Sequence, residues 1–420
     1  MPDWYIAPYF FFFFTMISRP RGTRDFLPDE MRRRRDLEKR MRAVFERWGY
    51  EEVATPTFEH LELFTLKSGD AIIEELYEFA DKGGRGLALR PELTAPVIRM
   101  YINEMKNAPM PLKLYYFGNC FRYERPQRGR FREFWQFGCE LIGTDTPEAE
   151  AEVIALASTI MDEVGVKQEL HIGDLAIVRD LLGDLSQEEQ SMIMRLMDKK
   201  DEAGLREVLD ADIADKLFDL IEARSCDEIE ALMGASDEME HLRRVLDLLD
   251  VYGVKYQVDL GVARGLEYYT GVVFEIYGEG LGAESQVCGG GTYRLIPLFG
   301  GPDIPSTGFA IGFDRIMEIY GLEPEKEVRI VLVSTEDTRE EGIRIAGVLR
   351  KRYKTYLDIM QRGLRSQLHF ADRWNADYAV IIGPKEVRDG KVTLRDLESG
   401  EQETLTLDDC LEILAQRATA

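Results

Sequence analysis

The chain has few of the residues that bind metals or form disulfide frameworks. Its 420 residues include four histidines and five cysteines, and no two cysteines are spaced as Cys-x-x-Cys. This odd number without such spacing argues against a disulfide scaffold and a zinc cluster, and favours a reducing compartment. We expect Cys120, Cys139 and Cys288, which lie in strand-like segments, to be small buried residues.

The sequence also lacks a Walker loop and a dinucleotide-binding fingerprint, so any phosphate group must be bound by arginine side chains. The apolar stretch Tyr9 to Phe14 is too short to span a bilayer and has no positive residue before it, unlike a secretory signal. No membrane association is therefore expected. We expect the native chain to start at Met16, with residues 1–17 as a non-native or disordered extension.

Positive charges are outnumbered: 53 Lys and Arg stand against 77 Asp and Glu, and the net charge is −24. This argues against a chain-wide electrostatic attraction to nucleic acid, so an RNA partner would need a local basic patch. Residues 174–250 are helical in pattern and hold 9 Lys and Arg against 22 Asp and Glu. We expect them to form an acidic helical insertion, most of whose surface does not contact phosphate.

The most informative stretch is Asn119 to Gly143. Aromatic residues alternate with small or polar ones on either side of a turn at 126–130, which predicts an antiparallel hairpin. Gln136 and Glu140, at even spacing, should point to the same face. Guanidinium groups on a sheet suit a polyphosphate ligand, and the alternative is a basic hairpin that pairs with acidic surface elsewhere. The arginines concerned are Arg122, Arg125, Arg128, Arg130 and Arg132.

Two elements are expected before the hairpin. Asp29 can cap a helix that runs to Trp48, and the charge run Arg32–Arg35 is either a solvated face of that helix or an RNA contact. Tyr50 to Phe58 is typical of a strand interrupted by Pro56, and proline is tolerated mainly at sheet edges. An edge of that length needs cover, which a partner subunit could supply.

Two further stretches have open interpretations. Glu92 and Thr94 could jointly bind an ammonium group, or could instead belong to the capped first turn of a helix. The three glycines within Cys288–Tyr293 let a backbone approach a ligand closely, or form a β-bulge.

The composition changes at Val328. Strands and helices alternate from there to the C-terminus, which predicts a small α/β unit with roughly balanced charge. Its expected strands are 328–334, 356–360, 378–383 and 391–397, and its expected helices end near 353, cover 364–374 and begin near 408.

Three stretches resemble the class II aminoacyl-tRNA synthetases. Arg122-x-Glu124, with its basic loop and trailing aromatic residue, resembles motif 2. The proline-bearing edge strand resembles motif 1, which lies at the dimer interface of that class. Gly308–Arg315, a strand of small residues that enters a helix, resembles motif 3.

Two more motifs narrow the resemblance to the histidyl-tRNA synthetases. Arg264–Gly271 reads RGLEYYTG and resembles the family's RG-L-[DE]-Y-Y-T-G signature. Cys288–Tyr293 is similar to the family's second histidine-associated motif, although this chain has Thr292 and Arg294 where a commoner version has Arg and Asp. The resemblance extends from about residue 18 to the C-terminus, with all motifs in family order.

The resemblance implies an α+β fold. A class II catalytic domain built on an antiparallel sheet would cover 18–325 and contain the acidic insertion 174–250, and a small α/β anticodon-binding domain would follow at 328–420. It also implies a cytoplasmic homodimer that activates L-histidine with ATP and Mg²⁺, and then transfers the histidyl group to its tRNA.

The same resemblance implies roles for single residues. Arg122 and Arg264 would be catalytic and would hold the α-phosphate and the attacking carboxylate. The other ATP contacts would be Glu124, Arg130, Phe134 stacked on adenine, and Arg315. Histidine would be bound by Glu92, Thr94, Gln136, Glu140, Tyr268 and Tyr269. No residue is assigned to a metal.

The alternative function is that of a non-catalytic, synthetase-like regulatory subunit of the ATP phosphoribosyltransferase in histidine biosynthesis. Such proteins typically lack the C-terminal domain and lose active-site arginines, whereas this chain has Arg122, Arg264 and Arg315 and residues 328–420. A synthetase for another amino acid is disfavoured by Arg264–Gly271.

Overall fold

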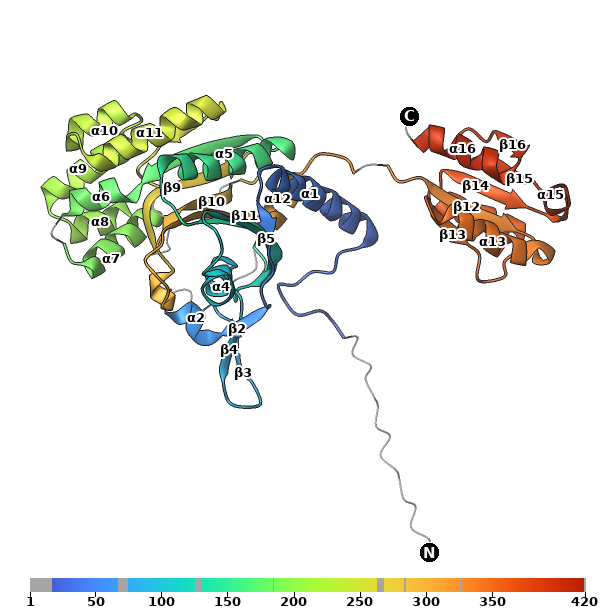
Figure 1. The fold of residues 1–420 in the computed structure, drawn as a ribbon, viewed down its shortest axis with the longest axis horizontal. Coiled ribbons are helices and arrows are strands. Elements are labelled where there is room, and N and C mark those ends of the chain that lie inside the picture. The colour runs from blue at the N-terminus through green and yellow to red at the C-terminus, as the bar shows by residue number, and fades with distance from the viewer. Residues whose placement is uncertain are drawn as a thin grey trace, which may run out of the picture. The chain divides into compact units, whose positions relative to one another are not determined.

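The computed structural model describes residues 17–66, 75–124, 130–183, 185–262, 268–282, 285–324 and 326–418. The chain divides into two compact units between Glu323 and Pro324 (Figure 1). In the described ranges no helix is long and apolar enough to cross a membrane. Arg264, the hairpin turn at 125–129 and the expected extension before Ile17 lie outside the described residues.

An eight-stranded sheet forms the centre of the first unit, in the order β1, β5, β6, β11, β10, β9, β7, β8. Neighbours are antiparallel except for β1 with β5 and β7 with β8. The strong alternation of the hairpin sequence gives β5 and β6, which pair antiparallel as predicted. The bounds are β1 (Glu51–Glu52), β5 (Leu112–Phe121), β6 (Glu133–Ile142), β7 (Gln168–Asp174), β8 (Gln257–Val258), β9 (Tyr269–Gly278), β10 (Gln286–Tyr293) and β11 (Ser306–Gly312).

Two long helices cover one face of this sheet. In Figure 1, α1 (Pro28–Arg47) and α5 (Pro147–Glu163) lie along it, and they pack against each other. The Phe45 ring of α1 stacks on the Tyr115 ring of β5 with centroids 4.9 Å apart. This burial of a helix stripe against a sheet removes apolar area from water and holds the two layers together. All five cysteines are buried and none forms a disulfide, which confirms the prediction that Cys120, Cys139 and Cys288 are buried.

The start of α1 differs from the prediction. Pro28 occupies the first turn, and the residue before it, Leu27, has no capping side chain. Asp29 therefore lies inside the helix rather than at its cap, and it pairs with Arg32 at 2.5 Å. Arg34 is only 5 % exposed, so it fits neither the solvated face nor the RNA contact that the charge run suggested.

The expected strand Tyr50–Phe58 forms two short strands. β1 lies at the edge of the main sheet, as predicted, and Pro56, which has no N–H to donate, lies in the segment between the two pieces. The second piece, β2 (Phe58–His60), joins a separate sheet in the order β2, β4 (Gly86–Leu89), β3 (Glu78–Ala80). Short helices complete this region: α2 (Leu61–Thr65), α4 (Thr94–Met100), the π-helix η1 (Tyr101–Met105) and the 3-10 helix η2 (Pro297–Phe299).

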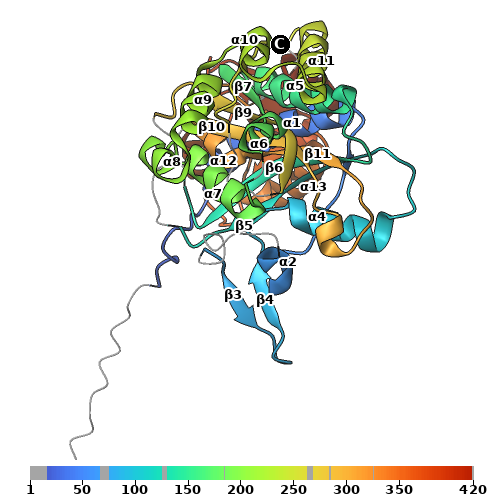
Figure 2. The same ribbon diagram turned by 90° about the vertical axis from the view of Figure 1, so that its left-hand side faces the viewer.

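The acidic stretch forms six helices that lie together at one end of the unit (Figure 2). Serine or aspartate side chains cap five of them, since they accept hydrogen bonds from the first-turn N–H groups. Two of these helices contact the main sheet or the helix layer that covers it: α11 packs against α5, and α6 against β9. The bounds are α6 (Leu175–Leu182), α7 (Gln187–Asp198), α8 (Glu202–Val208), α9 (Ala211–Glu222), α10 (Cys226–Met233) and α11 (Asp237–Tyr252).

The second unit is a five-stranded sheet with helices, in the order β13, β12, β14, β15, β16. The first three strands are parallel to one another, β15 is antiparallel to β14, and β16 is antiparallel to β15. The sequence pattern missed β16 and α15 because both are short. The strands are β12 (Arg329–Ser334), β13 (Lys354–Leu357), β14 (Tyr378–Ile382), β15 (Val392–Asp396) and β16 (Gln402–Leu405). The helices are η3 (Glu336–Thr338), α13 (Arg339–Leu349), α14 (Leu364–Arg373), α15 (Pro384–Asp389) and α16 (Leu407–Ala418).

Candidate active site

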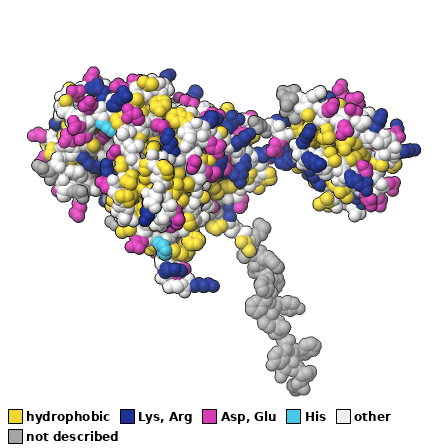
Figure 3. Space-filling view, in the orientation of Figure 1, with side chains coloured by type: hydrophobic (Ala, Val, Ile, Leu, Met, Phe, Trp, Pro, Cys, Tyr) yellow, Lys and Arg dark blue, Asp and Glu magenta, His cyan; other side chains and the backbone are white. Residues whose placement is uncertain are grey.

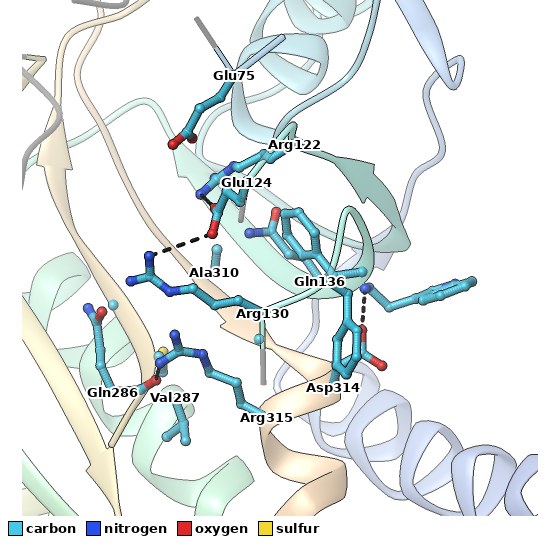
Figure 4. A pocket seen from close by; sticks show the side chains of 16 residues that line it. Glu75, Arg122, Glu124, Arg130, Gln136, Gln286, Val287, Ala310, Asp314 and Arg315 are labelled. Atoms are coloured by element: carbon cyan, nitrogen blue, oxygen red, sulfur yellow. Dashed lines mark hydrogen bonds and ion pairs between the residues drawn. The ribbon is translucent and has the colours of Figure 1, made fainter. Parts of the chain in front are cut away.

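A cavity of about 360 Å³ opens between the β5–β6 hairpin, strand β10 and helix α12 (Phe313–Ile319). Figure 4 shows side chains from these elements around it. A space of this size suits a nucleotide or a similar small ligand. Six residues predicted to bind ATP or histidine line it: Arg122, Glu124, Arg130, Phe134, Gln136 and Arg315.

Three guanidinium groups converge in this cavity from separate elements. Arg122 follows β5, Arg130 precedes β6, and Arg315 lies in the first turn of α12 (Figure 4). The Glu124 carboxylate lies 3.8 Å from Arg122 Nη1 and 3.5 Å from Arg130 Nη1. Arg315 Nη1 donates to the Gln286 carbonyl at 2.6 Å. Three cations in one cavity, two of them beside the Glu124 carboxylate, suit a polyphosphate.

Arg122 is held between a backbone carbonyl and an aromatic ring. Its Nε donates to the Pro91 carbonyl at 3.0 Å, and its guanidinium carbon lies 5.3 Å from the centre of the Phe134 ring. Phe134 is half-buried and lines the cavity, as expected for a ring that stacks on a base. The hairpin therefore brings a phosphate-binding group and an aromatic surface to one place.

Asp314 is a cavity residue that the sequence analysis missed. It is 2 % exposed, and its Oδ1 accepts hydrogen bonds from Arg24 Nη2 and Arg34 Nη1, both at 2.6 Å. Its Oδ2 accepts from the Trp135 backbone N–H at 2.7 Å (Figure 4). One carboxylate thus joins the N-terminal segment, helix α1 and the hairpin beside Arg315. Only the position next to Arg315 in the motif could have drawn attention to it.

Glu140 lies deeper in the sheet and is 1 % exposed. Its carboxylate accepts hydrogen bonds from the Tyr116 hydroxyl at 2.9 Å and the Tyr293 hydroxyl at 2.5 Å. Burial raises the pKa of Glu140 to about 7, while those hydroxyl groups act in the opposite direction. The rings of Tyr268 and Tyr269 lie 5.6 Å and 6.2 Å from that of Tyr293. Two phenol groups therefore donate to this carboxyl group, and the Tyr268 and Tyr269 rings pack beside the second of them.

Glycine 308 makes room for this carboxyl group. A Cβ atom at that position of β11 would lie 2.1 Å from Glu140 Oε2, closer than any real contact. The neighbouring Gly290 has the same constraint, because its Cβ would lie 2.2 Å from the Gly308 carbonyl oxygen. The three glycines of β10 pair with β9 in regular register, and Gly289 lines the cavity. The register shifts lie on either side of them, between Gln286 and Cys288 and between Gly291 and Tyr293. Close backbone approach therefore fits the glycines themselves, and the irregular pairing lies beside them.

Glu92 and Thr94 have the geometry of the capping interpretation. The Glu92 carboxylate accepts from the Thr94 N–H at 2.6 Å and the Ala95 N–H at 3.2 Å, at the start of α4. Thr94 Oγ1 lies 3.4 Å from the Tyr116 hydroxyl, which connects this helix end to the Glu140 group. Neither Glu92 nor Thr94 lines the described cavity.

Glu75 and Gln286 are two further lining residues without a sequence motif. Burial and the nearby Glu124 raise the pKa of Glu75, so this carboxyl group faces another of the same charge. Gln286 Nε2 donates to Glu275 at 2.6 Å, while its carbonyl holds Arg315. Neither could be found from local pattern, because each is defined by what the fold places opposite it.

The second unit has a hollow of about 760 Å³ along helix α14. Two aromatic residues line it, Phe370 and Trp374, with ring centroids 6.2 Å apart, and the Phe370 ring also stacks on that of Tyr356 with centroids 4.1 Å apart. Its rim carries Arg362, Arg365, His369 and Arg373. Cations around partly exposed rings are typical of surfaces that bind single-stranded nucleic acid.

Comparison with known proteins agrees with these two sites. Residues 22–316 match the family described as Histidyl-tRNA synthetase, and residues 327–417 match the Anticodon binding domain. The chain belongs to the histidyl-tRNA synthetase family. The family resemblance seen in the sequence and the α+β fold are therefore confirmed.

Relatives match nearly the whole chain. The Histidine–tRNA ligase of Methanosarcina acetivorans is 54 % identical over 94 % of this chain and 98 % of its own length. A solved apo histidyl-tRNA synthetase of S. aureus is 29 % identical, with a TM-score of 0.72 over 95 % of this chain and 99 % of that one. A Bacillus halodurans structure titled an ATP phosphoribosyltransferase regulatory subunit/histidyl-tRNA synthetase is 27 % identical, with a TM-score of 0.76 over 88 % of this chain and 98 % of that one. The much higher identity to the ligase favours the synthetase over the regulatory alternative.

Proposed function

We propose that the protein activates L-histidine with ATP to histidyl-adenylate and pyrophosphate, and then transfers the histidyl group to the 3′ end of its tRNA. The observation that carries this is the convergence of Arg122, Arg130 and Arg315 in one cavity, with Glu140 buried further along the same sheet. The first group is suited to a triphosphate, and the second to a polar side chain.

The first step needs positioning and charge cancellation more than acid–base chemistry. The histidine carboxylate attacks the α-phosphorus of ATP in line, and pyrophosphate leaves. Arg122 and Arg264 would hold the α-phosphate and the attacking carboxylate. Arg130 and Arg315 would hold the terminal phosphates, and Phe134 would stack on adenine.

Histidine would be selected by the Glu140 group. The Glu140 carboxylate accepts hydrogen bonds from the Tyr116 and Tyr293 hydroxyl groups at 2.9 Å and 2.5 Å. An imidazole N–H could join this hydrogen-bond network, whereas an apolar side chain could not. A site of this kind can reject apolar amino acids by a factor on the order of 10⁴. Gln136 on the same strand face, with Glu92 and Thr94, would orient the α-ammonium group.

Mg²⁺ would accompany ATP. Mg²⁺ in nucleotide sites is bound by one or two carboxylates plus phosphate oxygens, and in the described part of the chain no cluster of three metal-ligating side chains occurs. Glu75 and Glu124 fit this, because both line the cavity. Burial and the charge of Glu124 raise the pKa of Glu75, and a bound cation would relieve this repulsion. The ion would reduce repulsion between the phosphates and the histidine carboxylate.

The tRNA would be bound in part by the α14 hollow, with guanidinium groups on phosphates and Trp374 or Phe370 against a base.

A cytoplasmic homodimer is proposed as well. Hydrophobic side chains gather on the visible face of the first unit towards the three-stranded sheet (Figure 3). On strands β2 and β3 of that sheet, Phe58 and Phe79 are 52 % and 44 % exposed, and a second subunit could cover such residues.

Histidine-dependent exchange of labelled pyrophosphate into ATP tests the first step. The proposal predicts exchange with L-histidine and none with the other amino acids. Complete absence of exchange from folded protein would favour the regulatory subunit instead. Sedimentation of the same preparation at several concentrations tests the homodimer separately.

A further inference from the structure

The acidic insertion reaches the histidine side of the site at two places. The first is Arg179 on α6. Its Nη2 donates to the Tyr269 carbonyl at 2.7 Å, and its Nη1 donates to the Thr270 carbonyl at 3.3 Å. Tyr269 is the first residue of β9, so this half-buried guanidinium holds the backbone at the point where the strand begins.

The second place is His241 on α11. Its Nε2 lies 2.7 Å from Glu150 Oε2, on helix α5. The other oxygen of Glu150 accepts a hydrogen bond from the Thr292 hydroxyl on β10. Glu150 and Thr292 are 2 % and 3 % exposed, so each depends on these partners rather than on water.

Both places are next to side chains of the Glu140 group. The Tyr269 ring packs edge-on against the Tyr293 ring with centroids 6.2 Å apart, and Thr292 directly precedes Tyr293, whose hydroxyl donates to Glu140 at 2.5 Å. Since adjacent residues of a strand point to opposite faces, Thr292 can be held from the α5 side while Tyr293 faces Glu140. The insertion thus holds β9 and β10, the two strands that carry these rings.

We propose that the insertion is a clamp on the histidine pocket, in which Arg179 and His241 are positioning residues for the Tyr269 and Tyr293 rings. Neither residue touches the reacting atoms. Arg179 acts through the backbone of Tyr269, and His241 acts through Glu150 and Thr292. This inference rests on the proposed function, because it assigns the Glu140 group to histidine.

The clamp predicts an asymmetry between the two substrates. The contacts of the ATP cavity lie away from the two clamp contacts: Arg122 is held by Pro91, and Arg315 by Gln286, at the opposite end of β10 from Thr292. Loss of a clamp contact should therefore weaken histidine binding and leave ATP binding nearly unchanged. A contact that only supports the fold would lower stability without this difference.

The test is the pyrophosphate exchange assay on the full chain, with KM measured for each substrate and thermal unfolding measured alongside. Arg179→Gln and His241→Phe should each raise the KM for histidine by about tenfold, the usual effect of a lost charge-assisted hydrogen bond, with the KM for ATP within about twofold of wild type. Arg179→Lys, which can still donate to one carbonyl, should recover part of the loss. The matched control is Arg243→Gln on α11, since Arg243 pairs with Asp227 and Glu230 inside the insertion.

The outcomes separate the clamp from the proposed function. If wild type shows no histidine-dependent exchange, the proposed function and the clamp both fail. If wild type is active and the folded Arg179 and His241 variants keep their KM for histidine, only the clamp fails. Parallel increases in both KM values, or an equal effect of Arg243→Gln, would also overturn it. If Arg179→Gln does not fold, Arg179→Lys and His241→Phe decide the question.

Discussion

Asp314 and Arg34 are 280 residues apart in the chain and share a hydrogen bond of 2.6 Å. The Arg34 guanidinium also lies 4.0 Å from the centre of the Phe26 ring and 4.8 Å from that of Phe313. This buried ion pair ties helix α1 to the helix turn that carries Arg315. The position of Arg315, which we propose to bind the terminal phosphates, therefore depends on a residue at the other end of the first unit's sequence.

Asp314→Asn should destabilise the protein and weaken ATP binding. The substitution leaves two guanidinium groups beside a neutral amide in a buried site, which typically costs about 3–5 kcal/mol of unfolding free energy. The measurements are denaturant unfolding and the KM for ATP in the exchange assay. Asp29→Asn is the control, because Asp29 pairs with Arg32 on the surface of helix α1, which also carries Arg34. This substitution should change stability by less than about 1 kcal/mol. Equal effects of the two substitutions would contradict the role given to Asp314.

Arg264→Ala should abolish adenylate formation while leaving the fold intact, since the arginine is assigned to the attacking carboxylate and the α-phosphate. Circular dichroism monitors the fold, and single-turnover formation of histidyl-adenylate monitors the reaction. A variant with near-normal activity would refute the assignment.

Glu140→Gln should weaken histidine binding far more than ATP binding. The amide keeps the shape of the side chain but loses the carboxylate that an imidazole N–H would meet, and a lost hydrogen bond to a charged group corresponds to at least about tenfold in KM. Exchange kinetics at varied histidine and at varied ATP give the two values. Equal losses for both substrates would count against a role in reading the side chain.

The same substitution should change how stability depends on pH. Burial raises the pKa of Glu140 from 4.5 to about 7, so the folded state binds the proton more tightly than the unfolded state. The corresponding stability is fully present below pH 4.5 and is lost as the pH rises through about 7. The free energy of unfolding of wild type should therefore fall relative to Glu140→Gln by about 2 kcal/mol between about pH 5.5 and about pH 8. Parallel pH profiles would show that Glu140 ionises normally.

Arg373→Gln should raise the KM for tRNA in aminoacylation and leave pyrophosphate exchange unchanged. It removes a cation from the rim of the α14 hollow, and loss of a phosphate contact weakens RNA binding and lowers its dependence on salt. Arg344→Gln on α13 makes the same charge change in the same unit, at a residue that pairs with Glu341, and is the control. If both variants bind tRNA as wild type does, the hollow is not an RNA surface.

The elements that the sequence could predict are those set by local pattern. The period-two alternation around 126–130 predicts the β5–β6 hairpin, and the spacing of Gln136 and Glu140 predicts their common face. Asp314 could not be found in this way, because its role depends on Arg24 and Arg34, which no pattern relates to it. The cap predicted at Asp29 was wrong, because the helix already begins at Pro28, which places Asp29 in its first turn. Glu92 fits two interpretations by sequence, and only the placement of the Thr94 N–H shows that it caps α4.

The lack of space at Gly308 limits how this pocket could acquire another specificity. A methyl group there would overlap Glu140 Oε2, and the Glu140 carboxyl group fills the volume that any larger residue at 308 would need. A Cβ at 308 would also lie 2.3 Å from the Cys139 backbone carbonyl oxygen, which no side-chain substitution removes. A lineage that exchanged Glu140 for a short side chain would therefore open a void that position 308 cannot fill, and recognition of another amino acid would have to come from residues of other elements around the pocket.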